Sequence, residues 1–245
     1  MIEDDPVLGA FIDNYPSDRT RLLLVAGVAL GIVWFIITVM LWQVEDGLAS
    51  AVTVIVIGIA TLFIGWFLAH YWNREVVLYK RGFSYREGSF LAFIRFHDVI
   101  KIHQKAERLS YFGGLVRRTI YRMTITTDQE ETITLHNNFY RKMSDLSLRM
   151  ELGVTESLRP KAKQTLNDSK KVAFTDVLMV GNLGLHVDDQ QLTWDAVKTI
   201  MVKGGHLRII SQDDELWYSA PIEAVANIRL LLELVRERLP EEVTA

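Results

Sequence analysis

The chain of 245 residues has no cysteine, only five prolines, and two long stretches without a charged side chain. The lack of cysteine excludes disulfides, thiolate nucleophiles and cysteine-based metal sites. The uncharged stretches, Leu22–Trp42 and Leu48–Trp72, are almost entirely apolar. About 20 apolar residues in a helix cross the hydrocarbon core of a bilayer, where charges are costly. The sequence therefore predicts a transmembrane hairpin of two helices over residues 21–73.

Motifs of known enzymes are also missing. The six histidines have no metal-binding spacing, and no P-loop, dinucleotide fingerprint or nucleophile elbow is present. Acidic groups such as Asp188 and Asp189 fall in expected turns, where exposure to water explains them better than calcium binding. We expect no catalytic residues, no cofactor and no metal, and hence a non-enzymatic protein. An enzyme whose site uses no recognised motif is the alternative.

The charges that flank the apolar stretches predict their orientation. Arg19 and Arg21 precede the first stretch and Arg74 follows the second, whereas the short connection over residues 43–47 has no lysine or arginine. Because positive charges accumulate on the cytoplasmic side, we expect a multi-pass protein of the cell inner (plasma) membrane with both termini in the cytoplasm.

Small residues recur at intervals of four in both apolar stretches. Gly27 and Gly31 form such a pair in the first, and Thr61, Gly65 and Ala69 follow the same spacing in the second. This spacing lets helix backbones approach closely. We expect it to serve packing of the hairpin on itself, with a dimer interface as the alternative.

The segments outside the hairpin fall into four parts. Residues 1–20 are acidic with weak periodicity, which predicts an N-terminal arm without regular structure. Residues 74–153 alternate between apolar and polar side chains, which predicts antiparallel strands, and an amphipathic helix capped by Asn138 follows them. Residues 154–171 are polar and predict a linker with a short helix. Residues 172–240 again predict strands followed by a helix. The fold class is therefore α+β.

The two strand-rich parts show a weak internal repeat. Phe96–Ile102 aligns with Trp194–Ile200, since each begins with an aromatic residue followed by valine three and isoleucine six positions later. The pairs Gly82-Phe83 and Gly184-Leu185 precede these segments at similar distances. Strands followed by a terminal helix, occurring twice, favour duplicated small β-rolls.

This pattern resembles bacterial pleckstrin-homology-like (PH-like) and GRAM-type modules. More narrowly, residues 75–238 resemble an uncharacterised bacterial family of membrane-tethered proteins with two such halves. Four segments carry the resemblance: Thr119–Thr127, Val172–Gly184, Leu192–Trp194 and Trp217–Asn227. The resemblance implies tandem PH-like β-rolls, each closed by a C-terminal helix, and it implies no catalytic residues.

The charge is distributed unevenly. Residues 74–122 have a net charge of +7, and residues 171–245 a net charge of −5. Anionic lipids attract surface lysine and arginine, so the membrane-proximal lobe is a candidate for lipid or partner binding. The alternative explanation of its charges is the positive-inside bias together with exposed strand faces. The candidate residues are Lys101, Lys105, Arg108, Tyr111, Phe112, Arg117, Arg118 and Arg122.

These observations lead to a functional hypothesis. We expect a membrane-anchored scaffold or accessory subunit whose lobes bind a protein partner or join a larger membrane complex, because exposed strand edges can pair with a peptide. The alternative is a module that senses anionic lipid. A transport or channel function would require oligomerisation, since the spans carry no charge. Nucleic acid is not an expected partner, given a net charge of −3.

Overall fold

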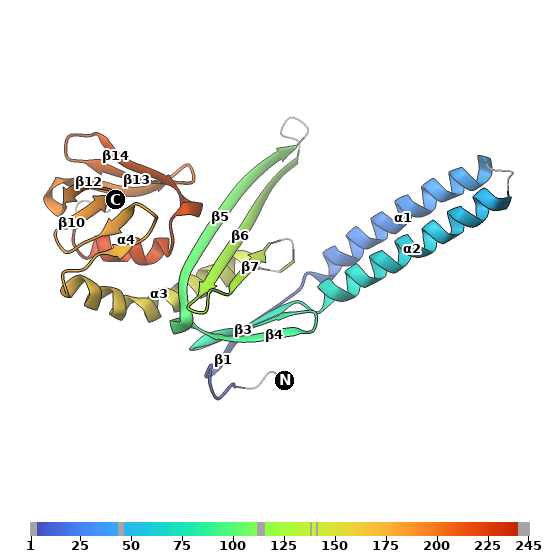
Figure 1. The fold of residues 1–245 in the computed structure, drawn as a ribbon, viewed down its shortest axis with the longest axis horizontal. Helices are drawn as coiled ribbons and strands as arrows, with labels where there is room; N and C mark the ends of the chain where they lie inside the picture. The colour runs from blue at the N-terminus through green and yellow to red at the C-terminus, as the bar shows by residue number, and fades with distance from the viewer. Residues whose placement is uncertain (1–3, 44–46, 112–115, 138, 141, 240–245) are drawn as a thin grey trace.

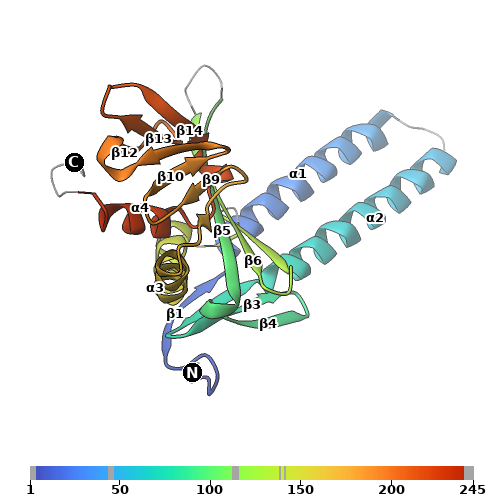
Figure 2. The same cartoon turned by 60° about the vertical axis from the view of Figure 1, so that its left-hand side comes forward.

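The structure is a computed structural model that describes residues 4–43, 47–111, 116–137, 139, 140 and 142–239. Within these ranges, only the backbone is described at residues 40, 41, 43, 47–50, 106–111 and 116–120. Figure 1 shows three parts: a helical hairpin, a central lobe of strands (lobe 1) and a C-terminal lobe (lobe 2). In both ribbon views the hairpin leaves lobe 1 on the side away from lobe 2 (Figure 2).

The two apolar stretches form long helices, as predicted. They are α1 (Arg19–Gln43) and α2 (Gly47–Trp72). Their segments Arg19–Val39 and Ala51–Trp72 are long and apolar enough to cross a membrane. Most of their side chains are exposed, and those of α1 that are buried, Leu22, Ala26 and Ile37, recur at intervals that place them on one face of the helix.

The glycines of the two apolar helices do not make the close contacts that the sequence predicted. A Cβ atom added at Gly27, Gly31 or Gly65 would meet no atom within 4 Å. These glycines therefore make no close approach between α1 and α2. The predicted close approach at the glycines is therefore wrong, because larger residues such as Leu22 and Ile37 form the buried face of α1. Thr61, Gly65 and Ala69 do lie on the side of α2 that faces α1, where they line a hollow with Leu30.

The N-terminal arm is not without structure, which corrects the prediction for residues 1–20. Strand β1 (Phe11–Pro16) pairs with β2 (Glu75–Tyr79) in antiparallel register, with Pro16 opposite Glu75. Tyr15 is 1% exposed and belongs to the core of lobe 1. The partner strand follows the whole helical hairpin, so no local pattern could indicate this pairing. The hairpin is consequently an insertion between the first two strands of lobe 1.

Lobe 1 contains two antiparallel sheets and a helix. One sheet has the order β1-β2-β3-β4 and the other β5-β6-β7. A 3-10 turn, η1 (Phe96–Asp98), connects the sheets. The remaining elements are β3 (Gly82–Glu87), β4 (Phe90–Arg95), β5 (Val99–Tyr111), β6 (Val116–Thr127), β7 (Thr132–His136) and α3 (Met143–Asn167).

Lobe 2 repeats this order. A sheet β11-β10-β9-β8 is followed by a 3-10 turn, η3 (Trp194–Ala196), a sheet β12-β13-β14 and a terminal helix, α4 (Ile228–Arg236). A second turn, η4 (Ile222–Ala224), precedes α4. The strands are β8 (Val172–Ala173), β9 (Leu178–Val180), β10 (Gly184–Val187), β11 (Gln190–Thr193), β12 (Val197–Lys203), β13 (His206–Ser211) and β14 (Leu216–Pro221).

Details of backbone geometry support the predicted repeat. The ladders of β5 and β12 shift register at equivalent points, between Val99 and Lys101 and between Val197 and Thr199. Gly82 and Gly184 also occupy equivalent positions. An added Cβ would lie 2.2 Å from the carbonyl oxygen of Ile94 at Gly82 and 2.1 Å from that of Leu192 at Gly184. The glycine–apolar pairs of the sequence therefore mark a close approach between strands in each lobe.

The segment expected as a linker, residues 154–171, is largely part of a continuous helix. Helix α3 runs from Met143 to Asn167 and contains Pro160. Leu146 and Met150 belong to the core of lobe 1, whereas Ala162 and Leu166 belong to that of lobe 2. Burial in both cores offsets the cost of about 3 kcal/mol for proline inside a helix. The predicted cap, Asn138, lies outside the described residues, and the helix begins after Lys142.

Candidate functional site

Strands β5 and β6 carry seven of the eight candidate residues. Lys101, Lys105 and Arg122 are described with their side chains. Arg108, Tyr111, Arg117 and Arg118 lie in the two strands, but only their backbone is described, and Phe112 lies outside the described residues. β5 and β6 are long strands that extend beyond the rest of lobe 1 (Figure 1).

The ladder brings Lys105 and Arg122 together. Lys105 lies directly opposite Arg122, and Arg122 lies opposite His136 on β7. These residues form a row across the three strands of the second sheet. Burial, followed by the charges of Arg122 and Arg74, lowers the pKa of His136.

The edge of β5 is also where lobe 2 docks on lobe 1. Asn227 donates from its backbone N–H to the Ile102 carbonyl (2.9 Å). Its side chain accepts from the Ile102 N–H (2.9 Å) and donates to the Ile100 carbonyl (2.8 Å). Asn227 thus pairs with the strand edge as a neighbouring strand would. The sequence did not indicate this role, since an asparagine before a helix is expected simply as a cap.

Ion pairs surround this contact. Lys105 Nζ lies 2.8 Å from Glu223 Oε2 in η4. Between helices α3 and α4, Arg159 pairs with Glu233, and Lys163 Nζ lies 2.8 Å from Glu237 Oε2. These contacts join basic residues of β5 and α3 to acidic residues of lobe 2. Of the three basic residues, only Lys105 belongs to the basic region 74–122, so helix α3 supplies most of the positive charge at this contact.

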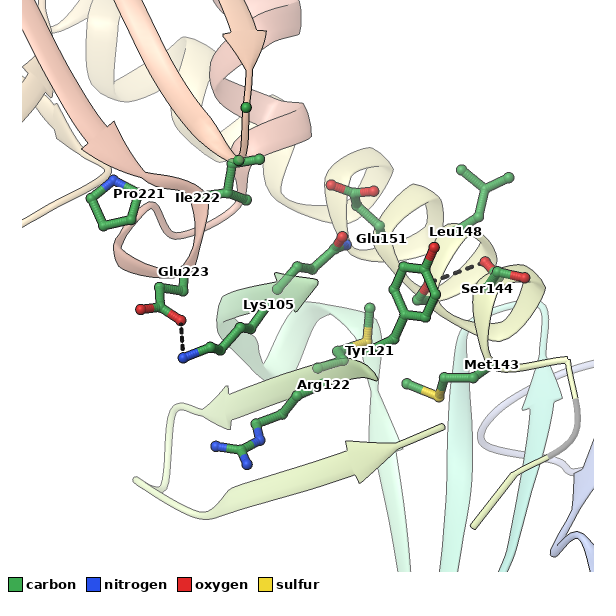
Figure 3. A pocket seen from close by; sticks show the side chains of 15 residues that line it. Lys105, Tyr121, Arg122, Met143, Ser144, Leu148, Glu151, Pro221, Ile222 and Glu223 are labelled. Carbon is green, nitrogen blue, oxygen red and sulfur yellow. Dashed lines mark hydrogen bonds and ion pairs between the residues drawn. The ribbon is translucent and has the colours of Figure 1, made fainter. Parts of the chain in front are cut away.

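A cavity of about 600 Å³ lies between the lobes, a size typical of small-molecule sites. Its walls come from β5, β6 and α3 of lobe 1 and from the β12–β13 turn and η4 of lobe 2 (Figure 3). The lining is mostly apolar, with Lys105, Arg122, Glu151 and Glu223 as its charged residues. Burial raises the pKa of Glu151, an effect that the Gln104 amide and Arg229 partly oppose.

A second polar cluster fixes the helical hairpin to lobe 1. The Arg74 guanidinium lies 4.3 Å from the ring centroid of Tyr71 and 4.6 Å from that of Phe139, and it pairs with Glu87. Ser17 Oγ donates to the Trp72 carbonyl (3.0 Å). An adjoining cavity of about 650 Å³ contains these charges, which already pair with one another. This cluster positions the hairpin, and it gives no indication of a ligand.

Among the side chains that the structure describes, no group of three histidine, aspartate or glutamate residues could hold a metal ion. The lobe junction offers two cationic side chains, Lys105 and Arg122, beside a largely apolar wall.

Comparison with known proteins adds one finding. No curated protein matches the chain significantly. The sequence pattern of one family, described as "Family of unknown function (DUF6585)", matches residues 2–242. This match includes β1, the inserted helical hairpin and both lobes. The chain therefore belongs to the DUF6585 family.

Proposed function

We propose that this protein is a non-enzymatic membrane-anchored scaffold or accessory subunit that binds a protein partner through PH-like lobes at the cytoplasmic face of a bacterial inner membrane. The observation that carries this proposal is the insertion of two apolar helices between β1 and β2. Because the hairpin starts and ends within one sheet, it would hold both lobes close to the bilayer. Tandem sheet-and-helix lobes with exposed strand edges support a binding role.

The edge of β12 is the surface that we assign to the partner. In lobe 1, the equivalent edge of β5 is already paired with Asn227. β12 is likewise the first strand of its sheet, with β13 on one side only. An extended segment of a partner protein could therefore add to β12 as a further strand.

Site-directed photo-crosslinking in cells tests this proposal. A photoreactive amino acid at Val202, which is 45% exposed on β12, should yield a discrete cross-linked protein. The same amino acid at Leu183, which is 71% exposed in lobe 2 outside the strands, is the matched control. Equal products from both positions, or none from Val202, would contradict partner binding at this edge.

A second candidate function is recognition of anionic lipid by lobe 1. It is favoured by the basic side chains of Lys105 and Arg122, which lie opposite each other in the ladder of β5 and β6, and by the net charge of +7 over residues 74–122. Flotation with neutral and anionic vesicles at low and high salt tests it. Binding should require anionic lipid, weaken with salt and decrease in Arg117→Ala/Arg118→Ala. Binding that ignores vesicle charge would exclude this function.

A further inference from the structure

The cavity between the lobes has an apolar side that faces outward without cover. Met123 and Met143 form its floor and are 1% and 4% exposed. Tyr121 and Leu148 also line it, yet they are 40% and 48% exposed. Figure 3 shows Leu148, Met143 and Tyr121 together at one end of the cavity. A ligand seated against these side chains would remove their apolar surface from water.

The other end of the cavity is cationic. Figure 3 shows Lys105 and Arg122 extending toward the same end, away from Leu148. Lys105 pairs with Glu223, whereas no carboxylate among the described side chains lies within ion-pair distance of Arg122. A smaller cavity of about 420 Å³ adjoins this end and shares both basic residues. The guanidinium is thus positioned to accept an anionic group, and arginine binds carboxylate and phosphate through paired hydrogen bonds.

The remaining charged group, Glu151, faces a cation that belongs to the protein. Burial raises the pKa of the Glu151 carboxyl, whereas the Gln104 amide and Arg229, in the first turn of α4, oppose this rise. A carboxylate near a helix N-terminus is stabilised by the unpaired N–H groups there. Glu151 is therefore balanced by lobe 2, and it does not require a cationic ligand.

The cavity therefore has a cationic end and an apolar end, which together fit a ligand with an anionic head and an apolar tail. We propose that the interlobe cavity binds a single-chain anionic amphiphile, such as a fatty acid, with its carboxylate on Arg122 and Lys105 and its chain against Tyr121, Met143 and Leu148. Both lobes contribute to the site, so a bound amphiphile would hold them together. The site goes beyond the proposed function, since it concerns a small molecule rather than a partner protein or a bilayer surface.

Photo-labelling of the full chain in lipid nanodiscs tests the proposal. The probe is dodecanoate with a diazirine at its terminal carbon, and labelled residues are mapped by mass spectrometry. Label should appear in residues 121–123 and 143–148, and excess unlabelled dodecanoate, but not acetate, should compete. Arg122→Gln should reduce this labelling about tenfold, as expected for loss of a charge-assisted hydrogen bond. Leu148→Glu should reduce this labelling similarly, because it places a negative charge beside the apolar alkyl chain of the anionic probe.

Two matched variants control for general effects. Arg208→Gln removes an exposed charge on β13, and Leu183→Glu places a charge at an exposed apolar position outside the cavity; both should label like the unaltered chain. Label confined to α1 and α2 would overturn the proposal, because it would report partition into the bilayer. The proposal would also be overturned if the matching diazirine alcohol labelled the cavity as strongly as the carboxylate probe does. The same holds if the Arg122→Gln variant were labelled as strongly as the unaltered chain. None of these outcomes depends on the cross-linking at β12.

Discussion

Asn227 makes three hydrogen bonds between the lobes, one through its backbone and two through its side chain. Its φ of 50° places it in the left-handed region, which asparagine tolerates better than most residues. This conformation precedes α4 and presents the backbone N–H and the side-chain amide to β5 together. Residue type and backbone conformation are therefore both needed for the contact.

The variant Asn227→Gly separates these two contributions. Glycine keeps the positive φ without strain and deletes the side-chain bonds to Ile100 and Ile102, which should weaken lobe docking by about 1–3 kcal/mol. Asn227→Ala should cost about 1–2 kcal/mol more, because alanine resists the left-handed conformation. Hydrogen exchange of residues 99–104 measures the effect as faster exchange. Unchanged exchange in Asn227→Gly would show that the side chain does not hold the lobes.

Gly82 is required by space rather than by φ. In Gly82→Ala the new Cβ would collide with the Ile94 carbonyl oxygen and the backbone of Arg95, so strands β3 and β4 would have to separate. We expect a loss of about 1–3 kcal/mol in the free energy of unfolding, measured by thermal unfolding of the full chain in detergent. Gly27→Ala is the control, since its Cβ meets nothing. Equal stability of the two variants would refute the close approach.

The hydrogen bond between Tyr15 and Asp145 makes stability depend on pH. Tyr15 Oη donates to Asp145 Oδ2 at 2.6 Å, and this bond, followed by that from Arg149, lowers the pKa of Asp145. Because the folded pKa lies below the ordinary value of about 3.9, the stabilisation is complete above that value and is lost as the pH falls through the folded pKa.

Asp145→Asn should therefore lower stability at pH 7 and flatten the decline of stability below about pH 4. Tyr15→Phe should have a similar effect, because it removes the donor. Urea unfolding of the full chain in detergent, between neutral and acidic pH, measures both effects. Curves that run parallel to that of the unaltered protein would show that this pair contributes nothing to the acid response.

At the scale of elements, the helical hairpin is an insertion whose two ends lie next to each other in lobe 1. Pro16 and Glu75 lie opposite each other at the ends of β1 and β2. A short turn can join two such strand ends. The chain therefore offers a route to a soluble form that keeps all strands of lobe 1.

Replacement of residues 17–74 by Asn-Gly should yield a protein that is soluble without detergent and keeps its strand content by circular dichroism. Truncation to residues 74–245 is the informative comparison. It removes β1 and with it the buried Tyr15, so it should unfold or aggregate. If both forms behave alike, β1 is dispensable for lobe 1. If the protein with the Asn-Gly turn unfolds while the truncated protein folds, the cluster around Arg74 is needed for folding.

Helix α3 joins the two lobes, because it packs in the cores of both. Its first half packs in the core of lobe 1, its second half in that of lobe 2, and Leu158 contacts both cores. A flexible linker would leave the lobes to move independently, whereas a helix buried at both ends restricts them. The interlobe cavity can therefore keep a defined shape.

At the scale of the whole molecule, the arginines at the base of the hairpin imply one orientation. Arg19, Arg21 and Arg74 all lie at the end of the hairpin that meets lobe 1. By the positive-inside rule that end, both termini and both lobes should face the cytoplasm.

Single cysteines report this orientation without interference, because the chain contains none. In intact cells, a membrane-impermeant maleimide should label Asp46→Cys, in the connection between α1 and α2. It should label Asp189→Cys, in lobe 2, only after the membrane is permeabilised. The reverse pattern would invert the topology, and labelling of both in intact cells would argue against membrane insertion.

The sequence by itself determined the elements whose signal is local. Continuous apolar runs specify α1 and α2, alternation specifies most strands, and the repeated Phe96 and Trp194 segments each form a 3-10 turn before a strand. These features depend on side chains within one or two turns of chain, where periodicity is informative.

Tertiary structure decided the features that join distant segments. β1 became a strand because β2, beyond the hairpin, supplied its partner; the expected linker became helix because two separate cores buried its apolar face. Lys105 and Arg122 met through ladder register, and the cavity arose only when Asn227 docked lobe 2 on β5. Hydrogen bonding and burial depend on proximity in space, which local periodicity does not encode.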